Sequence, residues 1–106
     1  MKRGDLLPDF VALLYGADNL LVDLTAATNV KLALKYQTGS TTPLLLTMAA
    51  DPDRLGRCTY AWQPGDTDTP GIFNGEIIVS WGGRAQTFPT EGYFTVQIVD
   101  DLESHP

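Results

Sequence analysis

The sequence predicts an all-β domain, an immunoglobulin-like antiparallel β-sandwich of about seven or eight short strands. Apolar and polar side chains alternate along several segments, as they do in a strand that has one face on a core and the other in water. Clusters of turn residues separate these segments at intervals of roughly 8 to 12 residues, which is the spacing of a sandwich or a barrel. From Gln37 onward, no segment carries apolar residues at helical spacing.

The clearest alternation occurs in the segment "NVKLALKY", Asn29 to Tyr36. Val30, Leu32 and Leu34 fall on one face, and the lysines of the segment fall on the other. A helix over residues 26–36 is the alternative interpretation, because Ala, Leu and Lys all favour helices. The strict alternation outweighs this propensity, so the segment is predicted to be a strand.

The chain before this strand predicts an arm, a strand and a hairpin. Residues 1–8 are mostly polar and are interrupted by Pro8, so they are expected to form an N-terminal arm. The apolar run from Phe10 to Tyr15 predicts the first strand, and "GADN" after it is a turn cluster. A second short strand is expected at Leu20 to Leu24.

The rest of the chain predicts further strands with one apolar face each. The loop "QTGSTTP" leads to a strand at residues 44–49, which ends at the turn "ADPDRLG". Gly82 and Gly83 suit a tight hairpin that pairs the strand before them with residues 84–88. The residues predicted to share an apolar face are Cys58, Tyr60 and Trp62 in one strand, Phe73, Gly75, Ile77, Val79 and Trp81 in the next, and Phe94, Val96 and Ile98 in the last.

Length and charge limit the classes of function. The 106 residues predict one domain over residues 1–106, with the arm at 1–8 and a C-terminal tail at 100–106. A formal net charge of −6 repels phosphate backbones and anionic membranes, so we expect neither nucleic acid nor a membrane as a partner. The apolar runs are too short to cross a bilayer and no signal sequence is visible. We therefore expect a soluble protein made in the cytoplasm.

Few residue types suit metal or nucleophilic chemistry. The single cysteine is Cys58, and the single histidine, His105, lies next to the C-terminus. This composition argues against zinc sites, Cys-His nucleophiles and Ser-His-Asp triads. Because Cys58 falls on an apolar strand face, it is predicted to be a small buried hydrophobe rather than a reactive thiolate. We predict no catalytic residue, no metal ligand and no cofactor.

The densest motif is "WQPGDTDTPG", Trp62 to Gly71. Asp66 and Asp68 have the D-x-D spacing of calcium loops, but Pro70 stands where another oxygen ligand is needed, and the bidentate Glu is missing. We interpret the motif as a corner, in which prolines fix φ, glycines permit turns, and Asp and Thr side chains bond to backbone amides. The segment "DPD" at Asp51 to Asp53 is interpreted in the same way.

Other candidate sites each have a structural interpretation. Glu76 and Glu91 have the residue type of an acid and base pair, but they are expected to be solvated surface carboxylates. The tripeptide "RGD" at Arg3 to Asp5 matches an adhesion motif and lies in the polar arm. A sugar-binding surface built on Trp62 and Trp81 is the alternative to core packing, which their places on apolar faces favour.

Three segments carry a resemblance to a known family: "KRGDLLPDF", "VDLTAATNVKL" and "CTYAWQPGDTDTPGIFNGEIIVSWGGRAQTFPTEGYFTVQIVDDL". They resemble small tailed-phage and prophage proteins related to the N-terminal domain of baseplate upper proteins. In that family a strand with Tyr and Trp leads to a W-x-x-G-D-T-D-x-P-G-x-Y corner, an E-x-x-V strand, a glycine hairpin and T-F-P-x-x-G-Y. The matching positions are Tyr60, Trp62, Gly65, Asp66, Thr67, Asp68, Pro70, Gly71, Glu76, Val79, Thr87, Phe88, Pro89, Gly92 and Tyr93.

The resemblance covers nearly the whole chain, with two departures. Phe73 stands where the family has a tyrosine, and the receptor-binding or stalk regions of larger baseplate proteins are missing. The resemblance implies a non-enzymatic structural protein of a tailed-phage virion, present in multiple symmetric copies, that binds other virion subunits in the baseplate, tail or head-tail region. The matching residues are implied to be structural.

Two alternatives stay open beside the baseplate or tail role. The first is a capsid decoration protein. The second is a carbohydrate-binding adhesion module on the virion surface, with Trp81 or Tyr93 as the platform on which a sugar stacks. The arm Met1 to Leu7 and the tail Asp100 to Pro106 are expected to contact other virion subunits, because both lie outside the predicted core.

Overall fold

A computed structural model describes residues 1–37, 43–89 and 93–99 of the chain. Within these ranges the chain forms seven strands and no helix, so none of the described segments is a helix that could span a membrane. The strands are β1 (Phe10–Leu13), β2 (Asn29–Tyr36), β3 (Leu44–Ala50), β4 (Arg57–Tyr60), β5 (Gly71–Trp81), β6 (Arg84–Phe88) and β7 (Phe94–Ile98). The prediction of an all-β chain is confirmed.

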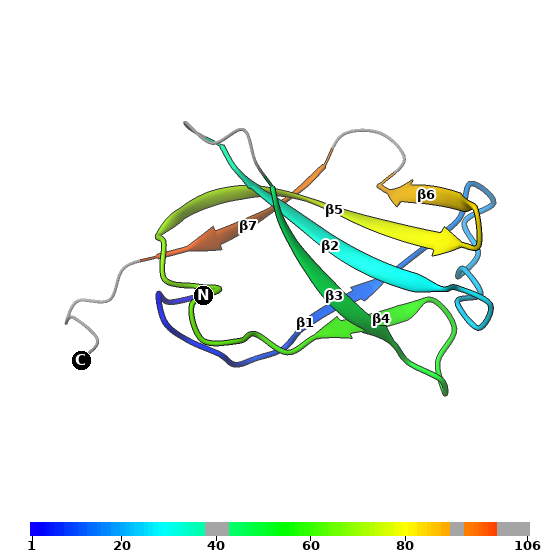
Figure 1. The fold of residues 1–106 in the computed structure, drawn as a ribbon, viewed down its shortest axis with the longest axis horizontal. Helices are drawn as coiled ribbons and strands as arrows, with labels where there is room; N and C mark the ends of the chain where they lie inside the picture. The colour runs from blue at the N-terminus through cyan, green and yellow to red at the C-terminus, as the bar shows by residue number, and fades with distance from the viewer. Residues whose placement is uncertain (38–42, 90–92, 100–106) are drawn as a thin grey trace.

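The strands form one curled antiparallel sheet in the order β1-β4-β3-β2-β5-β6 (Figure 1). The long strand β5 pairs with β2 on one side. Its other side is divided, because Gly71–Gly75 pairs with β7 and Ile77–Trp81 pairs with β6. The sheet therefore has β1 at one edge, with β6 and β7 following one another along the opposite edge.

Strand β3 is where the sheet bends. Its first part, through Met48, pairs with β2, whereas Ala49 and Ala50 pair with β4. Figure 1 shows β3 crossing the molecule diagonally, from beside β2 at its start to β4 at its end. The sheet is therefore curled, and residues of β2, β3, β4 and β5 contribute to one buried apolar cluster.

The alternation along each strand sets which side chains enter this core. In β2, Val30, Leu32 and Leu34 are buried as predicted, which supports the strand over the helical alternative for this segment. The same agreement holds for Cys58, Tyr60 and Trp62. The buried apolar cluster consists of Leu14, Leu24, Val30, Leu32, Leu34, Leu46, Met48, Cys58, Tyr60, Trp62, Ile77, Val79 and Phe88.

One predicted strand is wrong. Residues Leu20 to Leu24 do not form a strand, and their only ladder contact is a single antiparallel bridge between Tyr15 and Leu21. Side-chain hydrogen bonds lie at both ends of the segment, where the Oδ1 atoms of Asp18 and Asp23 accept from the backbone N–H groups of Leu20 and Thr25 at 3.1 and 2.9 Å. Local hydrogen bonds of this kind satisfy the backbone without a longer ladder.

The predicted glycine hairpin between β5 and β6 is present. Trp81 pairs with Arg84, so Gly82 and Gly83 form a two-residue loop. Gly82 has a φ of 63°, in the left-handed region that a residue with a Cβ adopts only at a steric cost. This hairpin fixes the register in which Phe88 lies opposite Ile77.

The start of the chain lies against β7 and the corner after β4. Lys2 pairs in parallel with Val99, and three backbone hydrogen bonds of 2.7 to 3.0 Å support this pairing: from Arg3 to the carbonyl of Val99, from Val99 to that of Met1, and from Met1 to that of Gln97. We call residues Met1–Asp5 the clasp, because they join the edge of β7 to the corner. The predicted tail, residues 100–106, is outside the described part of the chain.

Candidate functional site

The corner between β4 and β5 is organised by the carboxylate of Asp66. The hydroxyl of Tyr60 donates to its Oδ2 atom, and the backbone N–H of Gln63 donates to the same atom at 2.8 Å. The backbone N–H of Asp66 in turn donates to the carbonyl of Gln63 at 3.0 Å. Asp66 therefore ties the turn to the last residue of β4.

Tyr60 is a core residue whose hydroxyl depends on this carboxylate. Its ring packs edge to face against Trp62, with the centroids 5.4 Å apart. Burial raises the pKa of Tyr60 to about 12, and the neighbouring carboxylate of Asp66 acts in the same direction. The phenol stays protonated at neutral pH and serves as a structural donor.

The buried hydroxyl of Thr67 joins the corner to the clasp. Thr67 is 0% exposed, and its Oγ1 atom donates to the carbonyl of Asp5 at 3.0 Å. The carbonyl of Thr67 accepts from the backbone N–H of Gly4 at 3.1 Å. The arm is therefore held to the domain by backbone and side-chain hydrogen bonds at both the corner and β7.

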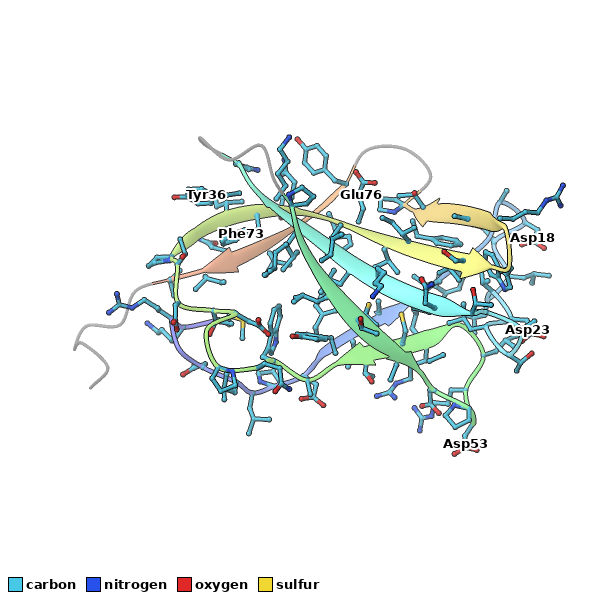
Figure 2. All side chains as sticks on the ribbon, viewed as in Figure 1. Asp18, Asp23, Tyr36, Asp53, Phe73 and Glu76 are labelled. Atoms are coloured by element: carbon cyan, nitrogen blue, oxygen red, sulfur yellow. The ribbon has the colours of Figure 1, made fainter. Side chains whose placement is uncertain are left out.

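The end of the corner is closed by a glycine under an aromatic ring. Gly71 has a φ of 147°, and a Cβ built there would lie 2.2 Å from the ring of Tyr36. The rings of Tyr36 and Phe73 lie side by side with their centroids 5.2 Å apart (Figure 2). Glycine is required here because any side chain would displace this aromatic pair.

The structure places the predicted motif residues in two separate regions. The corner and its flanks hold one group: Tyr60, Trp62, Gly65, Asp66, Asp68, Pro70 and Gly71. Phe88 and Pro89 lie at the end of β6, and Tyr93, which precedes β7, is 55% exposed. Gly92 is outside the described residues.

The acidic residues of the predicted turns have structural partners. Asp66 is engaged by Tyr60 and Gln63, while Asp68 is exposed. Asp51 accepts from the backbone N–H of Asp53 and from Arg57, which lowers its pKa. Among the described residues, no group of three or more His, Cys, Asp or Glu side chains is placed to hold a metal ion.

The other candidate groups have these positions. Cys58 is fully buried, and desolvation raises the pKa of its thiol to about 11. Trp62 is in the core and Trp81 is partly buried against it. Glu76 lies partly exposed on β5, and its suggested partner Glu91 is outside the described residues.

An apolar groove lies between the two edges of the curled sheet. Its volume is about 430 Å³. One wall comes from β1 and the residues after it, and the other comes from the end of β6, the start of β7 and β5. The lining consists of Phe10, Ala12, Leu13, Leu14, Tyr15, Ile77, Phe88, Pro89 and Phe94. At one end, the rings of Phe10 and Phe94 stack with centroids 5.7 Å apart and bring the two edges together.

Strand β1 presents an exposed apolar edge beside this groove. Val11, Leu13 and Tyr15 are 47%, 52% and 52% exposed on its outer face. The N–H of Leu14 donates to Gly56 on the side of β4, and backbone direction alternates along a strand. The N–H and carbonyl groups of Val11 and Leu13 therefore point away from β4, toward the open edge.

Sequence reasoning identified β1 as a strand but not as an edge. In the run "FVALLY", Phe10 to Tyr15, apolar residues occupy both faces of the strand, and no charge or proline interrupts them. Edge strands usually carry such interruptions, so the run by itself indicates a strand buried on both faces. Only the pairing order showed that one side of β1 is open.

Comparison of the chain with family models, with curated proteins and with solved structures found no match.

Proposed function

We propose that this chain is a non-enzymatic structural protein of a tailed-phage virion that binds other virion subunits. The observation that carries the proposal is the edge of β1, where apolar side chains are exposed and no strand of the described residues pairs with the outward backbone groups. Such an edge is a template for pairing with another chain. The resemblance of the Tyr60 to Tyr93 motif to proteins related to baseplate upper proteins supports the virion as the setting.

The finer description of the fold belongs to the same proposal. We infer an immunoglobulin-like β-sandwich, with β1 and β4 as part of one layer and β2, β5, β6 and β7 as the other. The bend in β3 supports two layers, because one strand pairs on both sides of it. The burial of Trp62 supports this inference, because such sandwiches have a tryptophan in their core.

The place in the particle is proposed as the baseplate, tail or head-tail region, with capsid decoration as the alternative. Many symmetric copies make weak contacts effective, since they act together. Cofactors and catalytic residues have no part in this role. The two described carboxylates with lowered pKa values, Asp23 and Asp51, are explained by hydrogen bonds within their own turns.

The experiment is to locate the protein in intact particles. Virions purified from a producing strain are analysed by mass spectrometry, and an epitope-tagged copy is detected by gold-labelled antibody in electron micrographs. We expect stoichiometric incorporation, with label at the tail end or the head-tail junction. Label over the whole capsid supports decoration instead. Absence of the protein from particles that are otherwise complete contradicts the proposal.

A carbohydrate-binding role is the second candidate, and the exposure of Tyr93 favours it. An exposed aromatic ring offers a face on which a sugar ring stacks. A glycan array probed with the purified protein and with Tyr93→Ala tests this role. A glycan signal that the substitution abolishes supports it, and a protein that binds no glycan removes it.

A further inference from the structure

We propose that the edge of β1 and the adjoining groove accept an extended segment of another protein, which has alternating apolar side chains and basic residues at its ends. The segment adds a strand beside β1 and covers the groove. This inference extends the proposed function, and it rests on that function only for identifying the partner as a virion subunit. The binding itself is a property of the isolated chain.

The backbone of β1 supplies the first part of the site. The N–H of Leu14 points toward β4, where it donates to the carbonyl of Gly56. Because backbone direction alternates along a strand, the N–H and carbonyl groups of Val11 and Leu13 point the other way, toward the open edge. An added strand satisfies these groups in a regular ladder. A small apolar ligand would fill the groove but leave the same groups unpaired.

The side chains of the groove supply the second part. Ala12 and Leu14 lie on the inner side of β1, opposite Phe88 and Phe94, with Ile77 between the walls. Successive side chains of an added strand point alternately into the groove and outward. Apolar residues at every second position therefore enter the groove, while the intervening ones lie beside Val11, Leu13 and Tyr15 on the outer face.

Charge specifies the ends of the segment. No Lys or Arg occurs from Gly4 to Val30, and this stretch carries four aspartates: Asp5, Asp9, Asp18 and Asp23. Asp9 immediately precedes β1, and Asp18 lies in the turn after it, at the end of the molecule that also holds Asp23 and Asp53 (Figure 2). The negative potential of this stretch attracts basic residues at the ends of an added strand.

The same charges argue against a second copy of this chain as the occupant. Antiparallel pairing of β1 with its own copy about Leu13 would bring Asp9 of each copy near Asp18 of the other. Like charges across paired strands are destabilising. The formal net charge of −6 on each chain adds to this repulsion. A partner segment with positive ends has no such cost.

The test measures binding of a capped, fluorescent peptide, Lys-Val-Thr-Val-Thr-Val-Lys, to the purified full chain by anisotropy. We expect saturable binding that weakens as salt is raised, because the end charges are exposed and screened. Two control peptides isolate the two features. Lys-Val-Val-Thr-Thr-Val-Lys keeps the composition but breaks the alternation, and Glu-Val-Thr-Val-Thr-Val-Glu reverses the end charges. Each is expected to bind at least about tenfold more weakly, as loss of one set of contacts implies.

Two variants of β1 test whether the peptide binds at this edge. Leu13→Lys places a charge on the outer face, and Leu13→Pro removes an N–H that points to the open edge, a substitution that edge strands tolerate. The matched control is Leu45→Lys on β3, since Leu45 is 58% exposed, lies opposite Ala33 of β2 and does not line the groove. We expect both Leu13 variants to lose at least about tenfold in affinity and Leu45→Lys to bind normally.

Three outcomes overturn the proposal. The first is a lack of selectivity: either the three peptides bind with equal affinity, or Leu13→Lys and Leu45→Lys lose the same peptide affinity while their unfolding midpoints stay unchanged. The second is a concentration-dependent dimer, seen by sedimentation, that Leu13→Lys dissociates, because the occupant is then a second copy. The third is peptide binding that requires removal of residues 100–106, because the chain's own end is then the occupant. Selective binding by a protein that is absent from virions would leave this inference standing and remove only the proposed function.

Discussion

The two edges of the curled sheet approach each other at a closed end, formed by the clasp and the corner, and at an open end, formed by the groove beside β1. The two ends differ in how the hydrogen bonds of their backbone groups are made. At one end, the clasp pairs with β7 and bonds to Thr67 in the corner. At the other, beyond the stacked rings of Phe10 and Phe94, β1 faces a groove, and within the described part of the chain no strand lies beside its outward groups. Both ends use the first fifteen residues of the chain.

The difference indicates how stability and binding are divided in this fold. The closed end buries the hydroxyl of Thr67, so the hydrogen bond of this group is costly to remove. The open end buries few side chains on its outer face, so a substitution there removes few stabilising contacts. We therefore expect large effects on the free energy of unfolding at the closed end, and effects on binding without loss of stability at β1.

The largest effect is expected for Trp62→Ala, beside the closed end. Trp62 is 5% exposed and contacts both Phe10 and Tyr60. Removing its ring leaves a cavity, which costs about 3 to 5 kcal/mol of the free energy of unfolding. Urea denaturation followed by circular dichroism measures the loss. A cost below about 1 kcal/mol would show that the ring is not part of a close-packed core.

Alkaline pH is expected to weaken the closed end next. The pKa of Tyr60 is raised to about 12 from its ordinary value of 10, so the folded state favours the neutral phenol. Its contribution is complete below pH 10 and is lost as the pH rises through about 12. Denaturation curves over this range measure the loss.

The control for the alkaline transition is Tyr60→Phe. This variant lacks the titrating hydroxyl, so its stability should depend less on pH between 10 and 12 than that of the wild type. Identical slopes for the two proteins would mean that another group causes the transition.

A smaller effect is expected for Asp66→Ala, which removes the acceptor of the Tyr60 hydroxyl and of the Gln63 amide. The buried phenol is left without a partner, at a cost of about 1 to 3 kcal/mol. Asp68→Ala is the control, because Asp68 is exposed and belongs to the same turn. If both variants lose the same stability in urea, the carboxylate of Asp66 does not organise the corner.

The smallest of these effects is expected for Thr67→Val, which keeps the side-chain shape and removes the hydrogen bond to the carbonyl of Asp5. We expect a loss of about 1 kcal/mol, with faster hydrogen exchange at the amides of Arg3 and Val99. The exposed Thr69 provides the control substitution Thr69→Val. Unchanged exchange at Arg3 and Val99 would show that the clasp is held without Thr67.

Part of the corner was predictable because its interactions are local. The spacing of Gly, Pro and Asp in "WQPGDTDTPG" predicts a turn with side-chain to backbone hydrogen bonds, and the bond between Gln63 and Asp66 is of this kind. The partner of Thr67 was not predictable. Asp5 is far away in the sequence, and a threonine in a polar motif gives no sign that it will be fully buried.

The sequence by itself determined which side chains face inward. Alternation in Val30, Leu32 and Leu34, and again in Ile77 and Val79, specifies a buried face, because successive residues of a strand point to opposite sides. The two glycines after Trp81 likewise determined a hairpin, since a tight two-residue loop needs a positive φ.

Only the tertiary structure decided which strands lie at the edges. The run "FVALLY" by itself indicates a strand buried on both faces, and the open side of β1 follows only from the bend in β3 and the pairing with β4. It also decided that Leu20 to Leu24 has a single bridge to Tyr15 rather than a strand. Pairing partners depend on contacts between segments that are distant in the sequence, and a local pattern of side chains does not determine these contacts.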